Sequence, residues 1–393
     1  MNAATLMFAR SSQRTRRLSV DPVLLLAVAG LLLLGLVMVS SASITVAASA
    51  VGNPFHYLQR QMLGVFLGVV AAATMCALPT SLWEKLAFPL LIAAFVMLVA
   101  VLIPGVGHTV NGSSRWLKLP FMNFQPSELA RVLLLMYLAS YIVRRQAELK
   151  ESVHGFIKPM SVLALAAGLL LLEPDFGAAT VLLATGTGML FLAGVKLRHF
   201  FAMVAIGVSA LGLIAVASPY RIRRLFGFIN PWDDPFNTGF QLTQSLIAIG
   251  RGEWFGVGLG ASIQKLFYLP EAHTDFVFAV LAEELGLVGI VVMLALYVVV
   301  ILRVLGVARL AAAVGHTYQA FVAASFGMWL GMQTCVNVGV NMGLLPTKGL
   351  TLPFLSYGGS SILVTLGWLG LVLRIHHEAA TSGRSAVVRE HNT

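Results

Sequence analysis

Residues 218–275 read SPYRIRRLFGFINPWDDPFNTGFQLTQSLIAIGRGEWFGVGLGASIQKLFYLPEAHTD. This stretch mixes Arg, Asp, Gln, Trp, Pro and Gly over a length far beyond that of an ordinary connection. It ends in a carboxylate, Asp275, directly before an apolar run, and nearly everything outside it is apolar span or short connector. We therefore expect the function of the chain to lie in this stretch.

The composition indicates a membrane protein. Of the 393 residues, 58% are hydrophobic and only 11% are charged, and the mean hydropathy is +0.87. That leaves too little polar surface for a soluble globular protein, and several apolar runs exceed the ~18 residues that can cross a bilayer. A β-barrel would show short segments of alternating hydrophobicity instead. Cys76 and Cys335 fall in apolar runs, so we expect neither a disulfide nor a metal site.

The predicted fold is an all-α polytopic membrane protein with about ten spans. The first apolar run, Val23 to Val46, is longer than the ~7–15 apolar residues of a cleaved signal, so it is read as an uncleaved span. Residues 218–276 form a large loop between the seventh and eighth spans. The expected spans are 22–46, 58–78, 82–103, 127–144, 158–172, 177–194, 199–217, 277–302, 317–342 and 353–375.

The charge distribution predicts the orientation. Basic residues recur in the connectors on the N-terminal side, which places both termini in the cytoplasm and the large loop outside it. The net charge of +10 is thus explained by topology and not by nucleic acid. We expect a basic cytoplasmic tail at 1–20, a single membrane domain at 21–375 and a second cytoplasmic tail at 376–393.

Several basic residues do not follow this preference for the cytoplasmic side, because the predicted topology places them outside the cytoplasm. They are tolerated surface charges, or they bind an anionic partner such as a lipid phosphate at headgroup depth, and ordinary membrane lipids would satisfy them equally well. The external basic residues are Arg115, Lys118, Arg221, Arg223, Arg224, Arg251, Lys265 and Lys348.

Within the loop, Phe240 to Ile249 has helical periodicity. We expect a short helix in the membrane interface or folded back over the bundle. Gln241, Gln244, Ser245 and Ala248 would share one face, and Leu242, Leu246 and Ile249 another.

Asp275 has two interpretations. A carboxylate directly before a helix is often a plain N-cap. Alternatively, it is a general base at the membrane surface, with His273 and Thr274 beside it. Glu283 and Glu284 lie on other faces of the same helix, so we expect them to be held in structural pairs.

The fourth span begins at Pro126, and Glu128 and Arg131 face each other one turn apart. They form an interfacial ion pair, or Glu128 directs Arg131 toward a substrate phosphate. No nucleotide-binding motif or ligand-spaced histidine cluster is present. Because nucleotides are not normally available outside the cytoplasm, an enzyme there would need an activated, membrane-anchored substrate such as a polyprenyl-diphosphate-linked sugar. External arginines would stabilise its leaving diphosphate.

Six ordered segments resemble the SEDS family of bacterial cell-wall polymerases, and the resemblance runs from about Val20 to Arg374. Within the family, the large loop is similar to that of the cell-division members rather than the elongation members. The segments are QPSELAR (125–131), EPDFG (173–177), AHTDF (272–276), AEELG (282–286), NMGLLP (341–346) and PFLSYGGSS (353–361).

The resemblance implies a peptidoglycan glycosyltransferase in the bacterial inner membrane at the division septum. Its substrate would be lipid II, and the essential aspartate of the large loop falls at Asp275. The family often has Lys where this chain has Arg131, and a bidentate Arg does not replace a Lys in every role. The implied partners are a class B penicillin-binding protein, which is a single-pass transpeptidase, and other divisome proteins.

In this interpretation Asp275 deprotonates the 4-hydroxyl of the acceptor N-acetylglucosamine, which attacks C1 of the N-acetylmuramic acid of the lipid-linked nascent glycan strand. Undecaprenyl diphosphate leaves. A divalent cation, Mg²⁺ or Mn²⁺, could assist, although the sequence contains no dedicated ligands. The candidate substrate-binding residues are Arg115, Glu128, Arg131, Arg221, Gln241, Ser245, His273, Thr274, Lys348 and Ser356.

Two other functions stay open. The chain could be a flippase that moves lipid II outward, or a non-catalytic scaffold of the division machinery. A flippase needs acids along a path open to both sides. The polar groups here concentrate at the outer face, which favours the polymerase.

Overall fold

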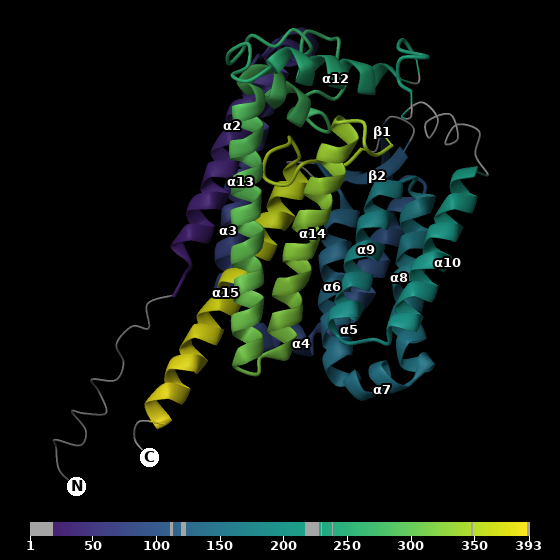
Figure 1. The fold of residues 1–393 in the computed structure, drawn as a ribbon, viewed down its shortest axis with the longest axis vertical. Helices are drawn as coiled ribbons and strands as arrows, with labels where there is room; N and C mark the ends of the chain where they lie inside the picture. Colours follow the sequence, from purple (N-terminus) through teal and green to yellow (C-terminus); the bar gives the residue numbers. More distant parts are fainter. Residues whose placement is uncertain are drawn as a thin grey trace, which may run out of the picture.

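A computed structural model describes residues 19–110, 113–118, 123–216, 228, 230–237, 239–346 and 349–390. Long helices stand roughly side by side, and one shorter helix, α12, lies across one end of them (Figure 1). The helices of the bundle are α2 (Pro22–Val51), α3 (His56–Ala77), α4 (Thr80–Lys85), α5 (Ala87–Leu102), α6 (Pro126–Arg144), α7 (Gln146–Glu151), α8 (Val153–Leu172), α9 (Phe176–Leu192), α10 (Leu197–Val216), α13 (Val277–Ala313), α14 (Thr317–Asn341) and α15 (Gly359–Glu390).

Every predicted span overlaps a helix of the described residues, which confirms the polytopic α-helical fold, although the third span is divided into α4 and α5 at Leu86. Among the residues that the structure describes, seven helices are long and apolar enough to cross a bilayer, and α5 and α9 are shorter apolar helices. The largest differences are at the last residue of the eighth span and at both ends of the last one, which continues to Glu390 instead of ending at 375. The eighth span continues to Ala313, and the last begins at Gly359 instead of 353, because residues before it form a loop in which Phe354 has a φ of 67°.

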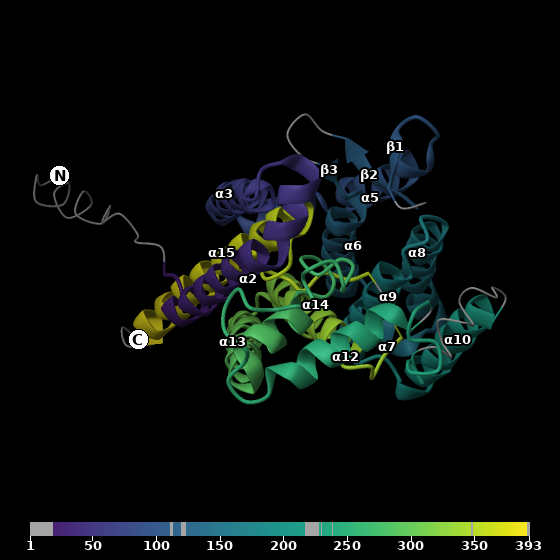
Figure 2. The ribbon, with the colours of Figure 1, turned by 90° about the horizontal axis from the view of Figure 1, so that it is seen from above.

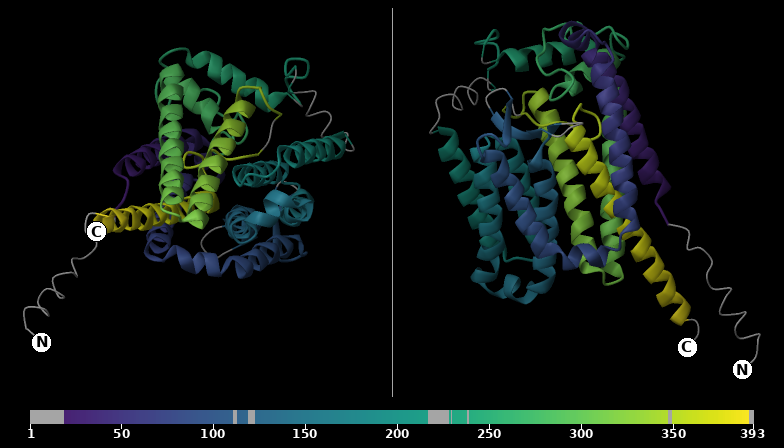
Figure 3. Two further views of the ribbon diagram at one scale, coloured as in Figure 1. Left: turned by 60° about the horizontal axis from the view of Figure 1, so that its bottom comes forward. Right: turned by 180° about the vertical axis from the view of Figure 1, so that it is seen from behind.

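Small residues bring helices from the two ends of the chain together. A Cβ on Gly370 of α15 would lie 2.2 Å from the carbonyl oxygen of Ala72 in α3, and one on Gly68 would lie 2.6 Å from Leu366. Backbones that approach this closely gain packing and exclude larger side chains. Figure 3 shows α3 lying along α15. This contact joins the first third of the chain to its last helix.

The first described residues and α15 meet at one end of the bundle, which we call the terminal end (Figure 1). Ser19 donates its backbone N–H to Nδ1 of His377 at 3.0 Å. Nδ1 of His376 lies 2.9 Å from the carbonyl oxygen of Ser19. Both ends of the described chain therefore lie on one side, as an even number of spans requires, and the cytoplasmic assignment of that side stays a prediction.

The opposite end, which we call the loop end, carries a small antiparallel sheet that the sequence analysis did not predict. Its strands are β1 (Gly107–Val110), β2 (Ser113–Lys118) and β3 (Asn123–Phe124), in the order β1-β2-β3. The strands are short, and the sequence between the flanking spans is rich in Gly, Ser and Asn, so it was read as a loop. The sheet positions Arg115 on its central strand.

Helix α12 (Phe240–Gly252) confirms the predicted helix in the large loop, and it crosses the loop end from α13 toward α10 (Figure 2). The side that packs on the bundle includes members of both predicted faces. Leu242, Ser245 and Ala248 are buried together on the side that faces the bundle. The reason is that α12 packs on the polar end of α14, where Ser245 Oγ donates to the carbonyl oxygen of Asn341 at 2.8 Å.

The segment after α12 anchors the large loop inside the bundle. Helix α13 is broken at Gly286, which has a φ of 64° and a ψ of −162°. The loop pairs with the backbone groups that the break leaves free: Val257 donates to the carbonyl of Glu283 at 2.9 Å, and Leu287 donates to that of Glu253 at 2.9 Å. The large loop is therefore part of the folded core and not a free surface connection.

Candidate active site

Asp275 lies at the loop end, directly before α13. The N-cap of α13 is Phe276, and no side chain caps this helix. The interpretation of Asp275 as a plain helix cap was therefore wrong. Its backbone carbonyl oxygen accepts hydrogen bonds from Nδ2 of Asn337 at 2.9 Å and from Nδ2 of Asn341 at 3.2 Å, both on α14. The backbone of Asp275 is thus held in place while its carboxyl group stays available.

The Asp275 carboxyl group makes no hydrogen bond or ion pair with the described residues. Its Oδ2 faces Gly349, where an added Cβ would lie 3.1 Å away. The side chain still touches solvent, but protein atoms surround it on nearly all sides. This burial raises the pKa of Asp275 to about 7, the negative charges of Glu271 and Asp175 raise it further, and Arg115 opposes them. Such a carboxyl group can accept and release a proton near neutral pH.

The turn between α8 and α9 lies within electrostatic reach of Asp275. Arg115 donates from Nε to the carbonyl oxygen of Glu173 at 3.0 Å and from Nη2 to that of Pro174. Asp175 caps α9 by accepting from the backbone N–H of Ala178 at 3.0 Å. The EPDFG segment thus does more than build a turn, because it holds the arginine whose charge acts on Asp275.

Glu173 is the unusual group in this turn. It is fully buried, and neither carboxyl oxygen has a hydrogen-bond partner among the described residues. Burial raises the pKa of Glu173 to about 8, the charge of Asp175 adds to the shift, and Arg115 reduces it. Glu173 is therefore mostly protonated at neutral pH, which removes most of the cost of burying it.

The predicted Glu128–Arg131 ion pair is present, and it is buried among the helices in the first turn of α6. Arg131 is 2% exposed and donates from Nη2 to Glu128 and from Nη1 to Oε1 of Gln333 at 3.1 Å. Its guanidinium lies over the ring of Trp329, 5.6 Å from the centroid. Gln333 in turn donates to the carbonyl oxygen of Thr351 at 2.9 Å. Both terminal nitrogens of Arg131 are thus engaged within the protein.

Three rings gather beside Asp275. The ring of His273 lies 4.6 Å from that of Tyr57, at the start of α3, and 5.6 Å from that of Tyr357. Tyr357 also donates its backbone N–H to the carbonyl oxygen of His273 at 2.9 Å. Burial lowers the pKa of His273, so its ring is neutral at pH 7. The sequence analysis had singled out His273 but neither tyrosine.

The other predicted site residues are spread over the loop end. Thr274 donates to Oε2 of Glu271 at 2.6 Å, and Gln241 is half-buried on α12. Ser356 is buried and accepts from the backbone N–H of Leu352 at 2.8 Å, which is a structural contact. Arg221 and Lys348 lie outside the described residues. The structure thus brings Arg115, His273 and Thr274 to Asp275, whereas Ser245 and Ser356 hold the backbone around it.

Glu283 and Glu284 form the structural pairs that the sequence predicted. Glu283 accepts from Nη1 of Arg251 at 2.9 Å and from Ser262 Oγ. Glu284 accepts from Nζ of Lys265 at 2.8 Å. Both glutamates are fully buried, so these bonds also tie the large loop to α13.

Sequence reasoning missed the amides that organise the site, Gln333, Asn337 and Asn341. They are buried polar side chains inside the apolar run of α14, a placement that is expensive unless each amide has partners. The cost of burying an amide in an apolar helix was the feature of the sequence that could have identified these three residues. In the part of the chain that the structure describes, no group of three or more His, Cys, Asp or Glu converges as a metal site.

Comparison with known proteins places the chain in a family. The FtsW/RodA/SpoVE family, described as cell cycle protein, matches residues 22–381. A protein of Thioalkalivibrio sulfidiphilus named probable peptidoglycan glycosyltransferase FtsW is 54% identical over 93% of this chain and 92% of its own length. A Legionella pneumophila protein of the same name is 51% identical over 91% of each chain.

Solved structures agree. A chain of a peptidoglycan synthase complex, studied for its coordination of polymerization and crosslinking, is 33% identical and matches with a TM-score of 0.75 over 92% of this chain and 99% of that one. The Thermus thermophilus rod shape determining protein RodA is 32% identical, with a TM-score of 0.69 over 92% and 98% of the two chains. The chain therefore belongs to the FtsW/RodA/SpoVE, or SEDS, family.

Proposed function

We propose that this protein polymerises lipid II into glycan strands for the division septum, with Asp275 as the general base. The curated relatives, named probable peptidoglycan glycosyltransferase, support the activity. The observation that supports the role of Asp275 is its carboxyl group, which has no partner among the described residues, is fixed through its backbone by two asparagines, and has a pKa raised to about 7.

The reaction needs one proton acceptor. The 4-hydroxyl oxygen of the acceptor sugar forms a bond to C1 of the lipid-linked donor sugar, and its proton passes to the carboxylate of Asp275. The bond from C1 to the phosphate oxygen breaks, and the diphosphate leaves with that electron pair. One attack from the face opposite the leaving group inverts C1. No general acid is required, because a diphosphate leaves as a stable anion.

Arg115 is the described cation that we assign to the leaving diphosphate. Its charge acts on Asp275, and its backbone contacts to the 173–175 turn fix its position. Preorganised positive charge of this kind stabilises the charge that develops in the transition state. Arg131 is assigned a structural role instead, because Glu128 and Gln333 occupy its terminal nitrogens.

The rings of Tyr57, His273 and Tyr357 are assigned to the sugars. They form a compact aromatic surface beside Asp275, and apolar faces of pyranose rings pack on such surfaces. Thr274 and Gln241 are polar groups at the same end of the bundle. A divalent cation held mainly by the substrate diphosphate would need only one or two protein carboxylates.

The assembly and location belong to the same proposal. The match to a chain of a peptidoglycan synthase complex favours a crosslinking partner, which we assign as a class B penicillin-binding protein. In that arrangement the loop end faces outward, the terminal end faces the cytoplasm, and the complex acts at the septum.

A paired experiment separates this function from its alternatives. The protein, assembled with its transpeptidase partner, is supplied with lipid II, and both glycan strands and lipid movement across vesicles are measured. We expect strands from the wild type and none from Asp275→Asn. Lipid movement that persists in Asp275→Asn while no strands form in either protein would favour a flippase. A wild-type complex that does neither would favour a scaffold.

A further inference from the structure

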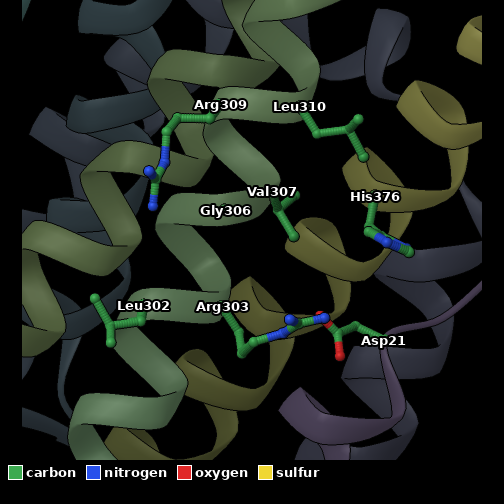
Figure 4. Close-up of a pocket in the computed structure, with 8 residues that line it drawn as sticks. All are labelled: Asp21, Leu302, Arg303, Gly306, Val307, Arg309, Leu310 and His376. Carbon is green, nitrogen blue, oxygen red and sulfur yellow. The ribbon is translucent and has the colours of Figure 1, made fainter.

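A hollow opens on α13 at the terminal end of the bundle, far from Asp275 along the same helix. It has a volume of about 370 Å³ and centres on Gly306 (Figure 4). A Cβ placed on Gly306 would meet no atom within 4 Å, so the missing side chain creates the space. Arg309 and Leu302 lie on one side of Gly306 in Figure 4, and Arg303 and His376 on the other.

The hollow has an excess of positive charge. Arg303 donates from Nε to Oδ2 of Asp21 at 2.7 Å, and Asp21 also caps α2 through the backbone N–H of Val23 at 3.0 Å. Among the described residues Arg309 pairs with no carboxylate, and its one hydrogen bond there runs from Nε to the carbonyl oxygen of Leu305 at 3.4 Å. Of these two arginines, only Arg303 is paired with a carboxylate, and the terminal nitrogens of Arg309 have no hydrogen-bond partner among the described residues.

An exposed apolar stripe leads along α13 to this hollow. Its members recur every three or four residues, so they share one helix face, and Gly306 and Arg309 continue the same spacing. From its first to its last member the stripe rises roughly 16 Å at 1.5 Å per residue, about half of the ~30 Å hydrocarbon core. The stripe consists of Val291, Ala295, Val298 and Leu302, all exposed.

The apolar stripe followed by the basic hollow matches the order of acyl chain and headgroup in one leaflet of a bilayer. An acyl chain would lie along the stripe, and the polar headgroup would reach the hollow over Gly306. We propose that the hollow binds the phosphate of an anionic phospholipid, with Arg309 as the contact, while Arg303 stays paired with Asp21 and adds positive charge to the hollow. Basic pockets between membrane helices at the cytoplasmic side are suited to such headgroups. A zwitterionic lipid would bring its ammonium group against the arginines, which disfavours it.

The experiment measures lipid binding by the purified full-length protein in detergent. Native mass spectrometry gives the dissociation constant for the first bound phosphatidylglycerol, phosphatidylethanolamine or inorganic phosphate. Two variants remove the site by different routes. Arg309→Gln removes the charge, and Gly306→Leu fills the hollow with a residue that favours a helix. Arg198→Gln and Gly207→Leu are the matched controls on α10, where Arg198 is exposed and a Cβ on Gly207 meets no atom within 4 Å.

We expect the wild type and both controls to bind phosphatidylglycerol about tenfold more tightly than phosphatidylethanolamine, since a charge-assisted hydrogen bond accounts for a difference of that order. Both pocket variants should lose this preference. Equal binding of the two lipids by the wild type would overturn the proposal, as would a preference that both pocket variants keep. Tight binding of inorganic phosphate without any preference among lipids would assign the hollow to a soluble anion instead.

Discussion

Asn337 of α14 donates from Nδ2 to the backbone carbonyl oxygen of Asp275 at 2.9 Å and to that of Leu350 at 2.6 Å. One buried amide therefore joins the residue before α13 to the loop that faces its carboxyl group. This arrangement positions Asp275 without using its side chain, which is what a general base requires.

The first prediction concerns this amide. Asn337→Ala leaves two carbonyl oxygens short of a donor, and we expect a loss of about 1–3 kcal/mol in the free energy of unfolding. We expect the polymerisation rate to fall about tenfold, because Asn341 alone then holds the backbone of Asp275 and its carboxyl group is less precisely placed. Ser325→Ala, on the same helix, removes a hydroxyl that bonds only to the carbonyl of Val322 and should change neither quantity much. Equal rates for the two variants would show that Asn337 does not position Asp275.

The second prediction concerns pH. The base is active as the carboxylate, so the rate should rise as the pH increases through about 7, the pKa of Asp275 in the folded protein. Glu271→Gln removes a negative charge that raises this pKa, so the rising limb should move to lower pH. The measurement is the initial rate of polymerisation between pH 5 and 9. If the rising limb lies at the same pH in Glu271→Gln as in the wild type, the pKa seen in the rate profile does not belong to Asp275.

The third prediction concerns Glu173. An acid whose pKa is raised by folding, here from 4.5 to about 8, contributes stability below its unfolded pKa that is lost as the pH rises through its folded pKa. Glu173→Gln keeps the shape and cannot ionise. We therefore expect the wild type to lose thermal stability between pH 5 and 9 relative to Glu173→Gln.

Unfolding of detergent-solubilised protein over that range is the measurement. Glu151→Gln, at an exposed acid that forms no ion pair with the described residues, is the control and should follow the wild type. Parallel stability curves for Glu173→Gln and the wild type would mean that Glu173 has a partner in solution.

The fourth prediction concerns the break in α13. Gly286 has a φ of 64°, and a Cβ there would lie 2.4 Å from the backbone nitrogen of Gly256. Gly286→Ala should therefore destabilise the protein by at least about 1–3 kcal/mol and loosen the large loop. Gly212→Ala in α10, where a Cβ meets nothing within 4 Å, should be neutral or stabilising. Thermal unfolding and protease sensitivity of the large loop test this difference.

The helices could be predicted from the sequence because hydropathy and length report directly on bilayer crossing, as they do for α2 and α13. The break at Gly286 could not. It depends on backbone pairing with Glu253 and Val257, some thirty residues earlier in the chain, and a local pattern does not encode that contact. Which side of α12 packs on the bundle could not be predicted for the same reason, because it depends on the contact of Ser245 with the end of α14.

The residues of the candidate site also fall into some that the sequence could predict and some that it could not. Asp275, His273 and Arg115 could be chosen from their residue types in polar loops. Tyr57 and Asn337 lie inside helices far away in the sequence, and they join the site only through the packing of α3 and α14 against the loop end. The turn at 173–175 looked like a simple connector because its effect on Asp275 operates through Arg115 of β2.

The central claim is that Asp275 accepts the proton of the attacking hydroxyl. The most direct test is the initial rate of glycan polymerisation by Asp275→Asn in complex with its transpeptidase partner at pH 7.5. The substitution keeps the size of the side chain, and Asp275 caps no helix, so we expect unchanged folding and complex formation. We predict a rate about 10²–10⁴-fold below that of the wild type. A folded, assembled variant that polymerises lipid II within threefold of the wild-type rate would contradict the account.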